Sequence, residues 1–206
     1  MEFYRRHLPH IHLGQATFFI TFRLHNSLPN WIIRQIQEDL ELERMLLMNG
    51  VGDRKEFQRS YFEQFDKILD AQKDGNRWLN DPLIASIVAD AILYRNGKRF
   101  NLISYSIMPN HVHLLVTVTD AHEPSEKMRY THLTSVLQSL KSYTAIESNR
   151  KLGRRGQFWQ RESYDRVIRD QKELERTILY IVYNPVAAGF VKNWQEWKFT
   201  YCCYDL

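Results

Sequence analysis

The stretch Met108–Val116, MPNHVHLLV, lies where two apolar segments meet, residues 100–108 and 112–119, and both segments have the composition of β-strands. The proline and asparagine near its start interrupt the apolar run and predict a turn. Because residues two apart in a strand point to the same face, His111 and His113 share one side of the sheet, and the valine between them faces the core on the other. The stretch therefore predicts consecutive strands with a pair of imidazoles at the start of the second.

Hydrophobic periodicity on either side of this stretch predicts the remaining elements. The predicted strands cover residues 15–24, 100–108, 112–119 and 158–169. The predicted helices cover residues 31–48, 54–72, 127–148 and 171–183, and a further helix begins at Pro82 and ends near Asn96-Gly97. Asp81 and Asp170 are expected to cap the helices that follow them. The pair Asn184-Pro185 is expected to end the last helix.

Leaving out the two helices between residues 31 and 72, the predicted order is strand, helix, strand, strand, helix, strand, and then one more helix. This is the β-α-β-β-α-β pattern of a ferredoxin-like α+β sandwich with an additional C-terminal helix. The two remaining helices form an inserted helical hairpin at about residues 29–80. No internal repeat or low-complexity linker divides the chain, so residues 1–206 are predicted to form a single domain.

The composition of the 206-residue chain, 44% hydrophobic and 25% charged, excludes a disordered protein, a collagen and a coiled coil. No apolar run approaches the roughly 20 residues that span a bilayer, and the N-terminus lacks the apolar core of a signal peptide. We therefore expect a cytoplasmic protein without a membrane partner. The two cysteines, Cys202 and Cys203, are adjacent and supply neither a disulfide framework nor a zinc ligand set by themselves.

The net charge of +4 is a mild indication of an anionic partner, and the distribution of charge says more. Residues 149–161 contain no acidic side chain and carry two aromatic ones, Phe158 and Trp159. The basic side chains in this segment are Arg150, Lys151, Arg154, Arg155 and Arg161. Cations bind phosphates and aromatic rings stack on bases, so the segment predicts a nucleic-acid contact. The alternative is a solvated basic loop.

Two histidines alone do not complete a metal site, so a further oxygen or nitrogen donor must come from elsewhere. The alternative is a histidine pair that only forms hydrogen bonds. Tyr180 and Asn184 lie four residues apart, on one helix face, and Tyr143 and Glu147 have the same relation. A tyrosine of pKa about 10 is a weak nucleophile unless a cation polarises the phosphate that it attacks. This combination suggests phosphoryl transfer through a phosphotyrosine, and the residues alone do not choose between the two tyrosines.

Four segments in order carry a resemblance to a known family. They are residues 108–116, residues 138–144 (QSLKSYT), residues 156–162 (GQFWQRE) and residues 176–189 (RTILYIVYNPVAAG). Together they resemble the REP-associated tyrosine transposases, which belong to the single-tyrosine branch of the His-hydrophobic-His superfamily. The resemblance runs from Gln15 to the tail with Trp194 and Trp197, nearly the whole chain. Ser27-Leu28-Pro29, at the start of the insertion, resembles a subgroup of that family.

The resemblance implies a ferredoxin-like fold, dependence on Mg²⁺ or Mn²⁺, and cleavage and rejoining of single-stranded DNA beside a hairpin through a 5′-phosphotyrosine. It places the nucleophile on the helix that ends in Asn-Pro, which makes Tyr180 the nucleophile and Tyr143 a packing residue. It also implies His111 and His113 as metal ligands, with Asn184 as the third. Imidazoles suit softer metals than Mg²⁺, so Mn²⁺ is expected to support activity better in vitro.

The expected partner is single-stranded or hairpin DNA. The segment Arg150–Arg161 is expected to bind it, and Arg5 and Arg6 are expected to add contacts. Both a monomer and a homodimer are compatible with the sequence. One alternative function is a domesticated hairpin-binding protein with little turnover. Another is a metal-dependent phosphodiesterase, which would need further acidic ligands and would leave the basic segment unexplained. An RNA-binding module is a third alternative, and it gives no role to the histidine pair.

Overall fold

The structure is a computed structural model that describes residues 16–50, 64–72, 74–118 and 126–206. The N-terminal residues with Arg5 and Arg6, and residues 54–63 of the predicted helix 54–72, lie outside the described residues. Among the helices that the structure describes, none combines the length and the apolar character needed to cross a membrane.

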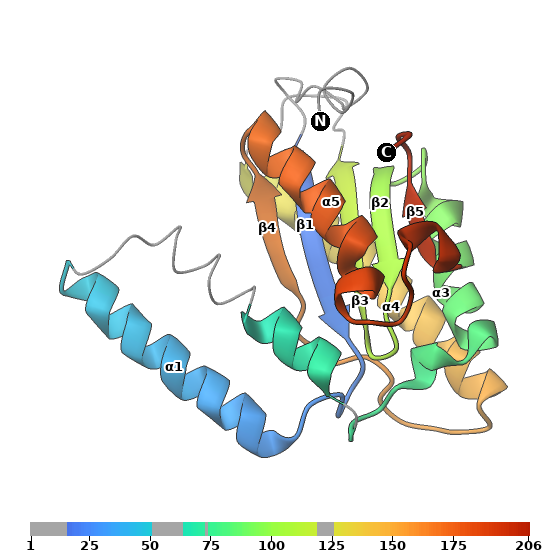
Figure 1. The fold of residues 1–206 in the computed structure, drawn as a ribbon, viewed down its shortest axis with the longest axis horizontal. Coiled ribbons are helices and arrows are strands. Elements are labelled where there is room, and N and C mark those ends of the chain that lie inside the picture. Colours follow the sequence, from blue (N-terminus) through green and yellow to red (C-terminus); the bar gives the residue numbers. More distant parts are fainter. Residues whose placement is uncertain (1–15, 51–63, 73, 119–125) are drawn as a thin grey trace.

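The centre of the molecule is a five-stranded sheet with the order β4-β1-β3-β2-β5, in which all neighbouring strands are antiparallel (Figure 1). Its strands are β1 Ala16–Arg23, β2 Asn101–Ile107, β3 His111–Val118, β4 Tyr164–Ile168 and β5 Thr200–Cys202. The central strands β1 and β3 pair along their whole length and are buried at every position. Strands covered on both faces explain the continuous apolar runs in the sequence.

Helices cover both faces of the sheet. The helices are α1 Asn30–Met48, α3 Pro82–Arg95, α4 Glu126–Lys151 and α5 Gln171–Ala187, with short 3₁₀ turns η2 Trp78–Asn80 and η3 Trp194–Glu196. Helices α3 and α4 share one core with the sheet, whereas α5 packs on the other face. Helix α1 extends away from the sheet, and the separate helical segment 64–71 lies beside the end of the sheet where β1 finishes and β3 begins (Figure 1).

Side-chain alternation along the strands separates the two cores. Phe18 and Ile20 of β1 face α3 and α4, while Phe19 between them packs with Leu115 of β3 and with α5. This alternation places the odd-numbered residues of β3, the two histidines included, on the α5 side. The predicted α+β class is confirmed.

The expected stop at Asn184-Pro185 was wrong, because α5 continues to Ala187. A proline removes one helical hydrogen bond, the one that its N–H would donate to the carbonyl four residues earlier. Pro185 lies in the last turn and is buried, so the helix tolerates that loss. Gly189 follows the end of the helix, and its φ of +75° allows the Gly189 and Phe190 N–H groups to bond back to the last turn. Asn184 therefore belongs to α5.

The predicted strand 158–169 is shorter than expected, since only Tyr164–Ile168 pairs along β1. Upstream of it, Trp159 makes a single bridge with Leu24, and the Lys141 ammonium donates to the carbonyls of residues 160 and 161. These contacts hold the loop before β4 at the end of β1. Strand β5, which extends the sheet beyond β2, was not predicted from the sequence.

Candidate active site

The first two inward-facing residues of β3, His111 and His113, form the centre of the site. Both imidazoles are fully buried, and their Nε2 atoms lie 3.0 Å apart with the rings nearly perpendicular. The strand alternation predicted from the sequence brings them together on one face, below α5.

A hydrogen bond at the other ring nitrogen orients each imidazole. Nδ1 of His113 lies 2.8 Å from Oγ1 of Thr21, and Nδ1 of His111 lies 2.7 Å from Oδ1 of Asn110. The Asn110 amide nitrogen donates to the Leu69 carbonyl, so its oxygen accepts and Nδ1 of His111 carries the proton. Nε2 of His111 then directs a lone pair at the centre, which is the arrangement of a metal-binding histidine.

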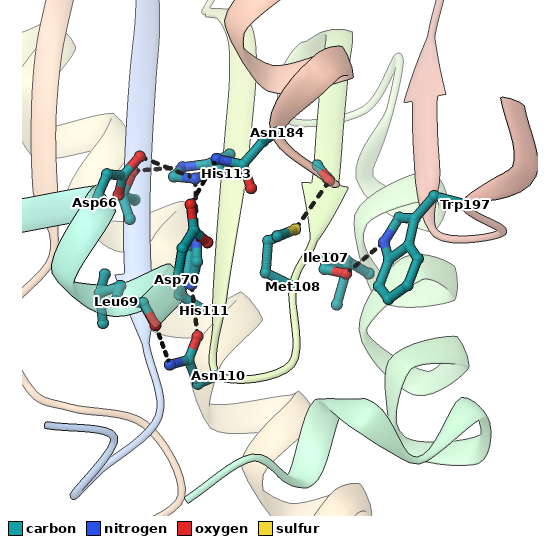
Figure 2. A network of polar contacts seen from close by, with 12 residues as sticks. Asp66, Leu69, Asp70, Ile107, Met108, Asn110, His111, His113, Asn184 and Trp197 are labelled. Atoms are coloured by element: carbon teal, nitrogen blue, oxygen red, sulfur yellow. Dashed lines mark hydrogen bonds and ion pairs between the residues drawn. The ribbon is translucent and has the colours of Figure 1, made fainter. Parts of the chain in front are cut away.

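Two carboxyl groups from the helical segment 64–71 complete the cluster (Figure 2). Oδ2 of Asp66 lies 3.1 Å from Nε2 of His113, and Oδ1 of Asp70 lies 3.9 Å from Nε2 of His111. Asp66, His111 and His113 are all buried, and each can direct one ligand atom within 4.8 Å of the other two. Two nitrogens and a carboxylate oxygen form a donor set for a divalent metal ion.

Several polar atoms of this cluster have no hydrogen-bond partner among the described residues. They are both carboxyl oxygens of Asp66, Oδ1 of Asp70 and Oδ1 of Asn184. Buried oxygens without donors are unfavourable, because they lose hydration and gain no bond in return. A cation accepts such lone pairs, so the residues present fit a divalent metal ion.

Burial shifts the pKa of each titratable group in this cluster. It raises the pKa of Asp66 and of Asp70 to about 7, and it lowers the pKa of His111 and of His113 to about 3. The like charge of Asp66 raises the pKa of Asp70 further, and the Asn184 amide opposes this. At neutral pH both imidazoles are therefore neutral, the form that binds metal.

Helix α5 brings Tyr180 and Asn184 to the same site. The half-buried Tyr180 ring lies 5.5 Å from the His113 ring and 6.1 Å from the Phe19 ring, measured between centroids. One turn further on, the Asn184 amide donates to Oδ2 of Asp70 at 3.4 Å (Figure 2). The predicted shared face of these residues is present, and Asn184 contacts the cluster through Asp70.

Tyr143 lies on α4, which packs on the opposite face of the sheet. Its side chain is 51% exposed, and its ring lies 5.8 Å from the Arg95 guanidinium. The structure therefore brings Tyr180 to the histidines and leaves Tyr143 away from them.

The family model described as "Transposase IS200 like" matches residues 76–184, more than half of the chain, including both histidines, Tyr180 and Asn184. The chain belongs to the IS200-like transposase family. A Haemophilus influenzae protein named for the REP-associated tyrosine transposases is 30% identical over 103 residues, which are 49% of this chain and 58% of that protein. A solved structure of a REP-associated tyrosine transposase bound to a REP hairpin aligns with 97% of this chain and 82% of its own, at 18% identity and a TM-score of 0.44.

The basic segment of this IS200-like transposase lies at the same end of the sheet as the histidines. The bridge between Leu24 and Trp159 holds its last residues next to the end of β1, where Arg23 pairs with His111. Its charged side chains differ in their surroundings: Lys151, Arg155 and Arg161 are exposed, Arg150 pairs with Glu147, and the Arg154 guanidinium lies 3.8 Å from the centre of the Trp78 ring.

Trp159 does not fit the predicted role in base stacking. Its side chain is 5% exposed, its ring packs edge-on against Phe22, and its Nε1 donates to Oγ1 of Thr144 at 2.8 Å. The indole is a core side chain, because its apolar faces are covered and its polar atom has a partner.

Replacing Trp159 with phenylalanine is therefore expected to lower the free energy of unfolding by about 1–3 kcal/mol, through poorer packing and the loss of one hydrogen bond. Chemical denaturation measures this change. The DNA affinity of the folded variant is expected to equal that of the wild type in a binding assay well below the melting temperature. A loss of affinity with unchanged stability would instead assign the ring to the DNA interface.

Sequence reasoning missed Asp66 and Asp70. The stripe of Phe65, Ile68 and Leu69 predicts an ordinary apolar helix face, and that pattern assigns no role to the two acids beside it. Their spacing of four residues, next to that stripe, is the signal that could have indicated a carboxylate pair facing the core.

Proposed function

We propose that this chain cleaves and rejoins single-stranded DNA beside a hairpin, with Tyr180 as the nucleophile that forms a 5′-phosphotyrosine. The observation that carries the proposal is the position of Tyr180. Its ring lies 5.5 Å from that of His113, which belongs to a buried cluster of candidate metal ligands. Membership of the IS200-like transposase family supports the same reaction class.

In the proposed cleavage, the Tyr180 oxygen loses its proton and forms a bond to the phosphorus of the scissile phosphodiester. The bond from phosphorus to the 3′ oxygen breaks, and that oxygen takes up a proton to leave a 3′-hydroxyl. Attack by a 3′-hydroxyl on the phosphotyrosine reverses these steps and releases Tyr180. One phosphodiester is exchanged for another, so the reaction needs no external energy source.

The residues proposed to hold the divalent metal, Mg²⁺ or Mn²⁺, are His111 and His113, with an oxygen ligand such as Asn184. A cation bound there would polarise the phosphate and stabilise the negative charge that develops on it. Thr21 and Asn110 hold the imidazoles in place, and the Phe19 ring contacts the rings of both His113 and Tyr180.

The polarity of the link tests this proposal. A hairpin oligonucleotide with a single-stranded flank would be labelled at one end or the other, incubated with Mn²⁺ and separated under denaturing conditions. We expect the protein band to carry a label placed at the 3′ end and to lack one placed at the 5′ end, because the tyrosine would retain the 5′ phosphate of the downstream fragment. The opposite polarity would contradict the proposed intermediate.

We also propose that the exposed cations Lys151, Arg155 and Arg161 bind the DNA backbone, together with Arg150 and Arg154. Their position at the histidine end of the sheet supports this assignment. Arg5 and Arg6 remain predicted DNA-binding residues outside the described residues.

Replacing Arg155 and Arg161 together with alanine is expected to weaken hairpin binding. The plot of log affinity against log salt is expected to become less steep by roughly 0.7–0.9 for each phosphate that the variant no longer neutralises. Titrations at several salt concentrations measure both effects. Lys172→Ala, which removes an exposed cation at the far end of α5, is the matched control. If the double variant and the control keep the wild-type affinity and slope, the segment is a solvated loop.

A metal-dependent phosphodiesterase is the second candidate, and the carboxyl groups of Asp66 and Asp70 favour it, since that function needs acidic ligands. It predicts hydrolysis with free 5′ ends that persists in a Tyr180→Phe variant. A hairpin-binding protein with little turnover predicts tight binding without any cleaved product. The end-label experiment separates all three functions.

A further inference from the structure

We infer that the helical segment 64–71 is part of the metal centre, in which Asp66 supplies a carboxylate ligand and Asp70 positions Asn184 of α5. The inference rests on the proposed function in taking the histidine pair as the cation site. The family model begins its match at residue 76, so this segment lies outside the region that the model describes.

The surroundings of the Asp66 side chain are those expected of a metal ligand. Its side chain is 1% exposed, its Oδ2 lies 3.1 Å from Nε2 of His113, and neither of its oxygens has a hydrogen-bond donor among the described residues. A buried carboxylate is normally held by donors or by a cation. Because the ring nitrogen that it faces also points at the neighbouring imidazole, a shared cation would satisfy all three groups together.

Asp70 lies one helical turn beyond Asp66, so both carboxyl groups project from the same side of the segment. One oxygen of Asp70 faces His111 and the other accepts from the Asn184 amide. When both carboxyl groups are ionised and both imidazoles are neutral, their combined charge of −2 balances the charge of one divalent cation. Asp70 thereby joins the inserted segment to the helix that carries Tyr180.

Backbone contacts hold the segment against the same histidines. The Leu69 carbonyl accepts from the Asn110 amide nitrogen, and the Asn110 oxygen accepts from His111 (Figure 2). Leu69 itself is buried against Leu28 and Ile32. The segment therefore contacts the centre through two side chains and one carbonyl, and cation binding is expected to stabilise it in this place.

Direct binding of Mn²⁺ tests the ligand. We expect Asp66→Asn, which keeps the shape and removes the charge, to bind Mn²⁺ at least tenfold more weakly than the wild type in isothermal titration calorimetry. Asp74→Asn is the matched control, because Asp74 lies just beyond the segment and is exposed. Equal Mn²⁺ affinities for both variants and the wild type would overturn the inference.

Thermal melting distinguishes a ligand from a structural carboxylate. Mn²⁺ is expected to raise the melting temperature of the wild type and of Asp74→Asn, because a ligand that binds the native state stabilises it. Asp66→Asn is expected to melt no lower than the wild type without Mn²⁺, since it replaces a buried carboxyl group that lacks a hydrogen-bond donor with a neutral amide. It is expected to show a much smaller rise in melting temperature with Mn²⁺. If Asp66→Asn melted lower than the wild type without Mn²⁺ and kept the full rise in melting temperature with Mn²⁺, Asp66 would have a structural role and the assignment would be overturned.

Amide hydrogen exchange followed by mass spectrometry tests the positioning role of Asp70. In the full chain, Mn²⁺ is expected to slow exchange in peptides covering residues 64–72, and Asp70→Ala is expected to speed exchange at residues 181–188 of α5 while Asp74→Ala leaves it unchanged. The inference would be contradicted if Mn²⁺ left exchange in residues 64–72 unchanged and Asp70→Ala left exchange in residues 181–188 unchanged.

The inference and the proposed function fail in different ways. Mn²⁺-dependent protection of the segment without any protein–DNA adduct would support the inference and refute the proposed function. A wild-type rate of adduct formation by Asp66→Asn, with unchanged Mn²⁺ affinity, would support the proposed function and refute the inference.

Discussion

Replacing Tyr180 with phenylalanine is expected to abolish cleavage of single-stranded DNA beside a hairpin, to below about one part in 10³ of the wild-type rate, since the attacking oxygen is removed. The ring of Tyr180 packs edge-on against Phe19 and beside His113, and phenylalanine preserves these contacts. Stability and hairpin affinity are therefore expected to stay close to wild type. Gel assays of cleaved product with Mn²⁺ measure the rate.

Tyr143→Phe is the matched control for this change, because it removes the same hydroxyl from the other face of the sheet. We expect it to cleave at the wild-type rate. Cleavage abolished in Tyr143→Phe and kept in Tyr180→Phe would reverse the assignment of the nucleophile, and cleavage kept in both would remove tyrosine from the mechanism.

The second large effect is expected from His113→Ala. This change removes one of the two imidazoles at the centre and leaves Asp66 facing a cavity. Loss of a metal ligand is expected to lower the cleavage rate by roughly 10²–10³-fold, because the electrostatic contribution of a catalytic cation is several kcal/mol. The rate is measured over a range of Mn²⁺ concentrations, and high Mn²⁺ is expected to restore part of it.

His25→Gln provides the control for histidine loss. His25 lies near the end of β1, faces Gln160 and is not part of the buried cluster of Asp66, His111 and His113. We expect this variant to keep the wild-type dependence on Mn²⁺. If His113→Ala and wild type respond identically to Mn²⁺ and to a chelator, the histidine pair is not a catalytic metal site.

The sequence carries the information for the strands and for the geometry of the histidine pair. Alternation along Met108–Val116 is a local property, so the shared face of the two imidazoles follows from the backbone of one strand. The same holds for Tyr180 and Asn184, which lie one turn apart on α5. Strand β5, with only three residues, is too short to show a pattern.

Contacts between distant segments could not be predicted in the same way. Asp66 meets His113 across a separation of 47 residues, and no local periodicity specifies which face of an inserted helix meets which end of a sheet. The environment of Trp159 is a second example, because a tryptophan in a basic segment is compatible with base stacking and with a core position. The indole takes the core position because the loop before β4 is held against the end of β1, and the sequence of the loop does not specify that contact.

The most direct test of the account is to identify the residue that becomes linked to DNA. Wild-type protein would be trapped with a hairpin oligonucleotide and Mn²⁺, digested with protease and nuclease, and analysed by tandem mass spectrometry. We expect a nucleotide remnant linked through its 5′ phosphate to Tyr180. A remnant on Tyr143 or on any other residue, or cleaved DNA without a linked peptide, would contradict it.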